Sequence, residues 1–187
     1  MKTLARMALA GAETDAPLAP IRTESISALI ARQPFFKGLA AEHLDTLAES
    51  AMEMEFVAGQ SIFDEGSPAN RFYLILEGRV VLESEVKEHE CLPIRVLGRG
   101  DALGWAWLVP PNLLHFSARA LEPTRTIFFY GTRLREQCGQ DHELGYQLLT
   151  RVMEVVVQNL NAIQERLVEC ADPAKFSNPR LSALLKA

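Results

Sequence analysis

Residues 56–82 decide the fold, and they read FVAGQSIFDEGSPANRFYLILEGRVVL. The runs in this stretch are short, rich in branched and aromatic residues, and of period two, which is typical of β-strands. Gly59, Gly66 and Gly78 fall between the runs, where tight turns often need a positive φ. Similar runs continue from Glu53 to Tyr130 and make about seven or eight strands, which predicts a small closed β-roll or jelly roll.

Residues 100–120, GDALGWAWLVPPNLLHFSARA, form the predicted ligand-binding segment. Gly100 and Gly104 allow a tight turn and a close approach of the backbone to a ligand, and Trp105 and Trp107 follow at once. A glycine-led turn into a short helical turn presents unpaired backbone N–H groups, which can hold an anion. The alternative interpretation of these residues alone is a buried aromatic turn.

The order of motifs in residues 56–82 resembles the first half of a cyclic-nucleotide-binding domain. The family pattern is an aromatic residue, then Gly, Ile-Phe, Glu-Gly, Phe-Tyr, Ile and Gly-x-Val, and all of these occur here in order with the usual spacing. The resemblance covers roughly residues 25–170 and is to the bacterial Crp/Fnr sensor module. It implies an α+β protein in which a β-roll carries N-terminal helices and a long C-terminal dimerisation helix.

The segment 100–120 departs from the family pattern at two charged positions. In the family, Phe-Gly-Glu opens this segment and its Glu holds the ribose hydroxyl, and an Arg further along clamps the cyclic phosphate. Trp105 stands in place of that Glu, Leu114 stands in place of the Arg, and no arginine lies between Trp105 and Ala118. Hydrogen bonds to charged groups contribute about 1.5–3 kcal/mol each, so the loss of two weakens binding roughly a hundred- to ten-thousandfold. Ordinary binding of cyclic AMP or cyclic GMP is therefore not expected.

Aromatic and weakly basic side chains replace these charged groups. Trp105, Trp107, His115 and Phe116 can line a drier pocket for a different ligand, with an imidazole that changes charge near neutral pH. The alternative is a pocket filled by its own side chains. Ser117 matches a small hydroxyl position of the family and can donate to an anion. The candidate ligand-binding residues are Gly104, Trp105, Ala106, Trp107, Leu114, His115 and Ser117.

A long helix is predicted over residues 140–172, with Asp141 as its cap. Apolar residues recur along it with alternating gaps of four and three, which is the a/d seam of a coiled coil. A second apolar stripe, Leu148, Val152 and Val155, can pack on the β-roll. A helix with one apolar face for its own domain and another for a second copy of the chain predicts a homodimer. The predicted interface residues are Leu149, Met153, Val156, Leu160, Ile163 and Leu167.

The other boundaries follow from composition. Residues 1–22 are rich in Ala, Pro and Thr and are predicted to be a mobile arm. Residues 23–139 then form the roll and its flanking helices, the first through Ile26–Ile30 and the second over about residues 41–51. Residues 173–187 form a short tail, too short for the winged helix-turn-helix that transcription factors of this family carry at this place.

The net charge and the cysteine content limit the expected binding partners and the expected cellular compartment of the protein. A net charge of −5 disfavours a surface for duplex DNA, so no direct DNA binding is expected. Cys91, Cys138 and Cys170 are scattered, which indicates neither a disulfide framework nor a zinc site and suits a reducing cytosol. No secretory signal or membrane span is predicted, so the expected location is the cytoplasm, with no membrane partner.

No catalytic constellation is present in the sequence. Cupin metalloenzymes share a β-roll but need clustered His and carboxylate ligands, whereas His89 and His115 are the histidines of this roll. We therefore expect that the protein is not an enzyme and that it binds neither a cofactor nor a metal. The predicted function is a dimeric regulatory module that responds to a small ligand other than ordinary cyclic AMP or GMP and signals through a partner protein. The alternatives are a cyclic-nucleotide receptor that holds the phosphate through backbone N–H groups, or a Crp/Fnr-type transcription regulator acting with a separate DNA-binding partner.

Overall fold

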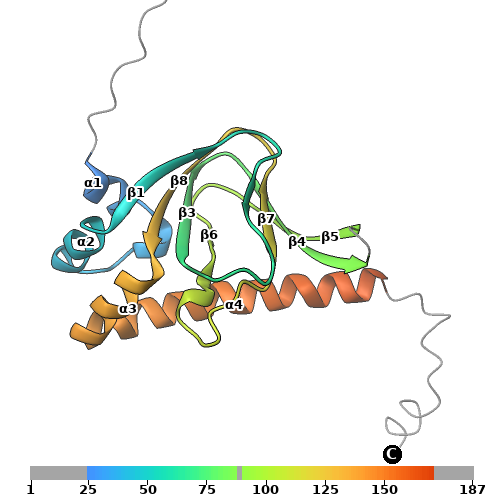
Figure 1. Cartoon of the computed structure of the whole chain (residues 1–187). Helices are drawn as coiled ribbons and strands as arrows, with labels where there is room; N and C mark the ends of the chain where they lie inside the picture. The colour runs from blue at the N-terminus through green and yellow to red at the C-terminus, as the bar shows by residue number, and fades with distance from the viewer. Residues whose placement is uncertain (1–24, 88–89, 171–187) are drawn as a thin grey trace, which may run out of the picture.

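The computed structural model describes residues 25–87 and 90–170 (Figure 1). The predicted arm 1–22 and tail 173–187 lie outside these described residues. The order of elements is α1 (Ile26–Ala31), the 3₁₀ turn η1 (Pro34–Phe36), α2 (Ala41–Ala48), β1 (Ala51–Phe56), β2 (Ser61–Phe63), β3 (Arg71–Glu77), β4 (Val80–Lys87), β5 (Glu90–Leu97), β6 (Ala102–Leu103), the 3₁₀ turn η2 (Trp105–Trp107), β7 (Ser117–Ala120), β8 (Thr124–Tyr130), α3 (Gly131–Gln140) and α4 (His142–Cys170).

The strands form two four-stranded sheets that close into a roll. The strand orders are β1-β8-β3-β6 and β2-β7-β4-β5, and every pair is antiparallel. Figure 1 shows the roll lying along α4, with α1, α2 and α3 gathered at one end. The predicted α+β fold, a β-roll with N-terminal helices and a long C-terminal helix, is confirmed.

Strands β3 and β8 are buried on both faces. Along β3, Phe72, Leu74 and Leu76 pack into the core beneath the helices, whereas Tyr73 and Ile75 point into the roll. Side chains of a strand alternate between the two faces of its sheet, so one strand serves both cores. The sheet β1-β8-β3-β6 is therefore the wall between the inside of the roll and the helices.

The inward face of α4 packs against this assembly. The predicted stripe is confirmed, and Leu144 extends it: the side chains of Leu144, Leu148, Val152 and Val155 are buried. In the described part of the chain, no helix is both long enough and apolar enough to cross a membrane.

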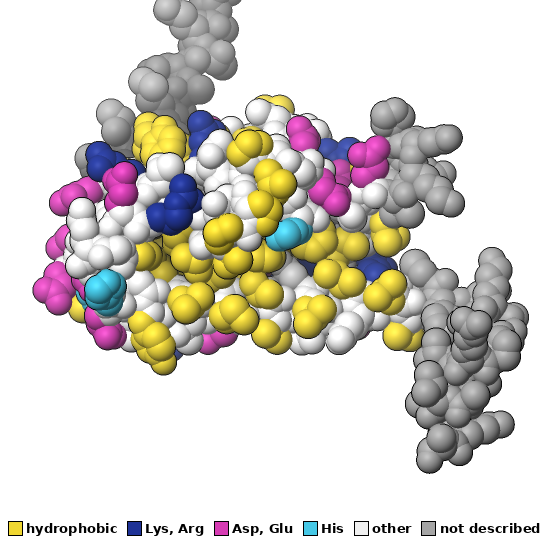
Figure 2. All heavy atoms as spheres, turned by 60° about the horizontal axis from the view of Figure 1, so that its bottom comes forward, with side chains coloured by type: hydrophobic (Ala, Val, Ile, Leu, Met, Phe, Trp, Pro, Cys, Tyr) yellow, Lys and Arg dark blue, Asp and Glu magenta, His cyan; other side chains and the backbone are white. Residues whose placement is uncertain are grey.

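The outward face of α4 carries most of the predicted seam. Figure 2 shows apolar side chains in a band along this face. The exposed fraction is 43–65% at Leu149, Met153, Leu160 and Leu167, whereas Val156 and Ile163 are half-buried. Tyr146 and Val157 are also exposed on α4 and extend the apolar set beyond the residues that the heptad spacing selected.

Asp141 caps α4 as predicted and also ties it to α2. Its Oδ1 accepts a hydrogen bond from the backbone N–H of Leu144 at 3.0 Å, and its Oδ2 lies 3.0 Å from Nε2 of the buried His43. The hydrogen bond from Leu144 and then the charge of His43 hold the pKa of the Asp141 carboxyl below its ordinary value.

The Asp141 carboxylate should stabilise the fold only where it is ionised. A lowered pKa means that its contribution is present above the ordinary aspartate pKa and is lost as the pH falls through the lowered value. Asp141→Asn keeps a capping oxygen and loses the charge, so its melting temperature should fall below that of the wild type at neutral pH and approach it in acid. Circular dichroism melts across pH measure this, with Glu154→Gln on the exposed side of α4 as control. A deficit of Asp141→Asn that stays constant into acid would contradict a role for the charge.

Candidate functional site

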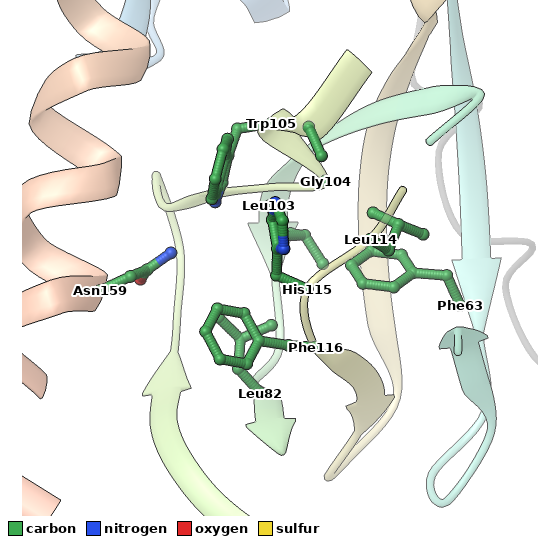
Figure 3. Close-up of a pocket in the computed structure, with 10 residues that line it drawn as sticks. Phe63, Leu82, Leu103, Gly104, Trp105, Leu114, His115, Phe116 and Asn159 are labelled. Carbon is green, nitrogen blue, oxygen red and sulfur yellow. The ribbon is translucent and has the colours of Figure 1, made fainter. Parts of the chain in front are cut away.

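A small cavity lies between η2, the segment before β7, and α4 (Figure 3). Its volume is about 20 Å³, which is room for about one water molecule. The lining residues come from β2, β4, β6, η2, the segment before β7 and α4: Phe63, Leu82, Leu103, Gly104, Trp105, Ala106, Leu114, His115, Phe116 and Asn159.

Gly104 sets the position of η2. Its φ of +78° lies in the left-handed region, and it stands directly before the 3₁₀ turn. A Cβ at this position would lie 2.6 Å from the backbone oxygen of Arg71 on β3. Another residue would therefore push η2 away from the sheet, because this contact is with backbone that cannot swing aside.

Trp105 and His115 close the rim of the cavity. Their rings stack with centroids 5.1 Å apart and an interplanar angle of 27°. Trp105 is half-buried and His115 is exposed, so the stack lies between the cavity and solvent. Figure 3 shows both rings beside the cavity, with Phe116 below His115. The stack leaves a cavity of about 20 Å³ behind it.

Leu114 is buried in the cavity wall, where the resemblance to the family places the phosphate-clamping arginine. Its backbone is fixed by two hydrogen bonds, from its own N–H to Ser67 O at 2.9 Å and from Gly66 N–H to its carbonyl oxygen at 2.8 Å. Among the described residues that line the cavity, His115 and Asn159 are the polar side chains, and no Arg, Lys, Asp or Glu is present. The cavity wall therefore holds no permanent charge for a phosphate.

Trp107 and Ser117, two of the predicted site residues, do not line this cavity. The Trp107 indole is fully buried in the core beneath the helices, with its ring 6.2 Å from that of Phe72. Ser117 faces away from the interior of the roll, since Ala118 next to it points inward, and its Oγ accepts a hydrogen bond from Glu65 N–H at 2.9 Å.

Arg119 shares the outer face with Ser117 and is already paired. Its Nη2 donates to both carboxylate oxygens of Glu83, at 2.6 and 2.5 Å. Neither the hydroxyl of Ser117 nor this guanidinium is directed at the cavity, so the outer face of β7 contributes no anion-binding group to it.

Sequence reasoning missed the lining residues Phe63, Leu82, Leu103 and Asn159, of which Asn159 is the polar one. It lies on α4, is 4% exposed, and turns its amide toward the cavity (Figure 3). The signal was present in the helix, because a polar residue continues the buried stripe of Leu148, Val152 and Val155 at the next inward position. A buried amide in such a stripe indicates that α4 makes a polar contact at this position, where its apolar contact with the roll ends.

The described part of the chain offers no obvious metal centre. No three His, Cys, Asp or Glu side chains gather there in a way that could hold a metal ion.

Comparison with known proteins identifies the family. Residues 53–141 match the family model described as the cyclic nucleotide-binding domain. A putative cyclic nucleotide-binding protein from Geobacter metallireducens GS-15 is 32% identical with a TM-score of 0.61, and the match covers 68% of this chain and 92% of that chain. A cyclic nucleotide-binding domain from Methylobacillus flagellatus superposes with a TM-score of 0.66 at 18% identity, covering 79% of this chain and 83% of that one. The chain belongs to the cyclic nucleotide-binding domain family.

Its curated relatives are Crp-like regulators. The CRP-like cAMP-activated global transcriptional regulator of Mycobacterium tuberculosis is 24% identical over 121 residues, which are 65% of this chain and 54% of that protein. The chain thus spans about half the length of this relative. Within the family, the chain is similar in sequence to regulators of the Crp type.

Proposed function

We propose that this chain is a non-catalytic regulatory module that responds to a small ligand other than ordinary cyclic AMP or cyclic GMP. The observation that supports this most is the stack of Trp105 on His115 at the rim, together with Leu114 in the wall. At the positions of the family's ribose-binding and phosphate-binding groups, the pocket offers an indole and an alkyl chain. Neither can accept from a ribose hydroxyl or donate to a phosphate as a carboxylate and a guanidinium do.

Ligand entry requires the rim to open. Small-molecule sites commonly enclose about 300–1,000 Å³, whereas this cavity holds about 20 Å³. The exposed His115 and half-buried Trp105 are the side chains whose rotation would enlarge it. A ligand that separates these rings would exchange one aromatic stack for another, since an indole and an imidazole both stack on flat molecules.

The effect of ligand binding would be transmitted from the pocket through α4. Asn159 brings this helix into the cavity wall, and the same helix carries the exposed apolar band. We propose that the band is the interface with a second copy of the chain, that occupancy of the pocket changes the angle or rigidity of the paired helices, and that a partner protein reads this change.

A second candidate is transcription regulation, favoured by the description of the Mycobacterium tuberculosis relative as a global transcriptional regulator. In that case the module would act with a DNA-binding partner. A third is a cyclic-nucleotide receptor that holds the phosphate on backbone N–H groups, favoured by the left-handed Gly104 that opens η2.

The wild-type chain should bind cyclic AMP and cyclic GMP at about millimolar dissociation constants or not at all, because both charged clamps are missing. Isothermal titration calorimetry measures this, with a cyclic-AMP-binding member of the family titrated in parallel as positive control. Micromolar binding by the wild type would overturn the proposal and favour recognition by backbone N–H groups.

A further inference from the structure

Arg95 of β5 does not line the pocket itself but contacts Asn159, which does, and it lines a separate surface hollow between β5 and α4. In the β4–β5 ladder it is directly opposite Leu82, whose side chain lines the cavity. Residues directly opposite in an antiparallel pair point to the same face of the sheet, so Arg95 leaves β5 on the pocket side. Its Nη1 donates to Oδ1 of Asn159, a second lining residue, at 3.3 Å. The guanidinium is therefore one side chain away from the cavity.

The partners of this guanidinium are loosely held. Besides the long bond to the neutral amide of Asn159, its Nη2 lies 3.8 Å from Oδ1 of Asp101. In contrast, Arg119 meets Glu83 at 2.5–2.6 Å. The Arg95 side chain is only 24% exposed, and a largely buried cation is favourable only when a close anion or good hydrogen bonds compensate its lost hydration. The lost hydration of Arg95 is thus poorly compensated, and the pocket nearby has no cation in its lining.

We propose that Arg95 supplies the cation of this pocket, in place of the arginine missing from the segment 100–120, and that the ligand is a flat aromatic anion. This inference rests on the proposed function, since it names the ligand class of the same site. The lining side chains Phe63, Trp105 and Phe116 supply faces for a flat ring. The guanidinium would bind the carboxylate or phosphate of the ligand with its planar fork.

The same residue links occupancy to α4. In the structure the Arg95 guanidinium bridges β5 and Asn159 of the helix. An anion in the cavity competes with the Asn159 oxygen for this guanidinium, and the amide, directed toward the cavity in Figure 3, is then free to bond the ligand. The contact between the sheet and α4 therefore passes through the ligand when the pocket is filled.

Calorimetry with two acids and their neutral amides tests the proposal. The probes are benzoate and indole-3-acetate, paired with benzamide and indole-3-acetamide. At least one acid should bind the wild type, and its amide should bind about tenfold or more weakly. Arg95→Met should weaken the acid about ten- to a hundredfold, as expected for a lost charge-assisted hydrogen bond, and leave the amide unchanged. Arg99→Met, at an exposed position just after β5, is the matched control and should bind like the wild type.

Equal affinity of the acid for the wild type and Arg95→Met would overturn the proposal. Equal affinity for acid and amide would do the same, as would the absence of binding by either acid up to about 10 mM. Arg95→Lys, which keeps the charge without the fork, should bind with intermediate affinity and guards against misfolding of the methionine variant. None of these results bears on dimerisation or on weak cyclic-nucleotide binding, so the proposed function is tested independently of the role of Arg95. Micromolar binding of cyclic AMP that Arg95→Met does not alter would overturn both.

Discussion

Leu160→Glu should convert a dimer into a monomer at micromolar concentration. Leu160 is 50% exposed in the middle of the apolar band on α4, and in a parallel pair of helices it would face its own copy. The substitution places two facing carboxylates in an apolar seam, where desolvation and repulsion add. We expect the dimer dissociation constant to rise at least about a hundredfold, measured by size-exclusion chromatography with light scattering.

The fold of the Leu160→Glu chain should persist, because the side chain is not part of the buried core. Gln158→Glu adds the same charge at an exposed position two residues away and is the matched control; it should remain dimeric. A wild-type chain that is monomeric at micromolar concentration would contradict the dimer directly, and so would a dimeric Leu160→Glu variant.

Trp105→Glu combined with Leu114→Arg should create measurable cyclic AMP binding. The two substitutions place a carboxylate and a guanidinium at the positions where the family pattern has them, and both residues line the cavity. The gain should be roughly a hundred- to ten-thousandfold, from about millimolar or weaker toward micromolar, for two restored charge-assisted hydrogen bonds. Removing the indole also removes the ring that stacks on His115, which opens the rim.

Leu113→Arg in place of Leu114→Arg is the matched control for this experiment. Leu113 is 41% exposed and does not line the cavity, so an arginine there adds the same charge outside the pocket. It should give no gain in calorimetry beyond that of Trp105→Glu alone. If the double variant binds no cyclic AMP, His115→Ala is added, which removes the remaining ring of the rim. A folded triple variant that still binds no cyclic AMP would contradict the assignment of Trp105 and Leu114 to the clamp positions.

The local structure could be predicted from residue spacing because its causes are local. Period-two runs separated by Gly59, Gly66 and Gly78 gave the strands, and these glycines have φ values of +77° to +93°. The run RFYLILE at residues 71–77, apolar from Phe72 to Leu76, indicated a strand, but its burial on both faces depends on which elements cover each face. Spacing along α4 separated an inward stripe from an outward one for the same local reason, because side chains three and four residues apart share a helix face.

The site could be predicted only in part, because its geometry depends on contacts between distant segments. Alternation placed Ser117 and Arg119 on one face of β7, but only the pairing of β7 with β4 and β2 shows that this face is the outer one. Trp107 follows Trp105 closely, yet a 3₁₀ turn has about three residues per turn, so the two side chains diverge. Asn159 and Arg95 meet across 64 residues of sequence, and no local pattern relates them.

The two-sided burial of β3 and β8 also limits which sequence changes the fold tolerates. A single inserted or deleted residue in β3 would exchange the side chains of the two cores, so the length and the apolar order of that strand are under joint constraint. The segment between β6 and β7 is held by the close approach of Gly104 to β3, by the buried Trp107, and by Leu114 with its two backbone hydrogen bonds. Of its rim residues, Trp105 is half-buried and packs against the core beneath the helices, whereas His115 is exposed and belongs to neither core. A change at the rim can therefore alter what the pocket binds with less effect on the scaffold than a change in β3 or β8.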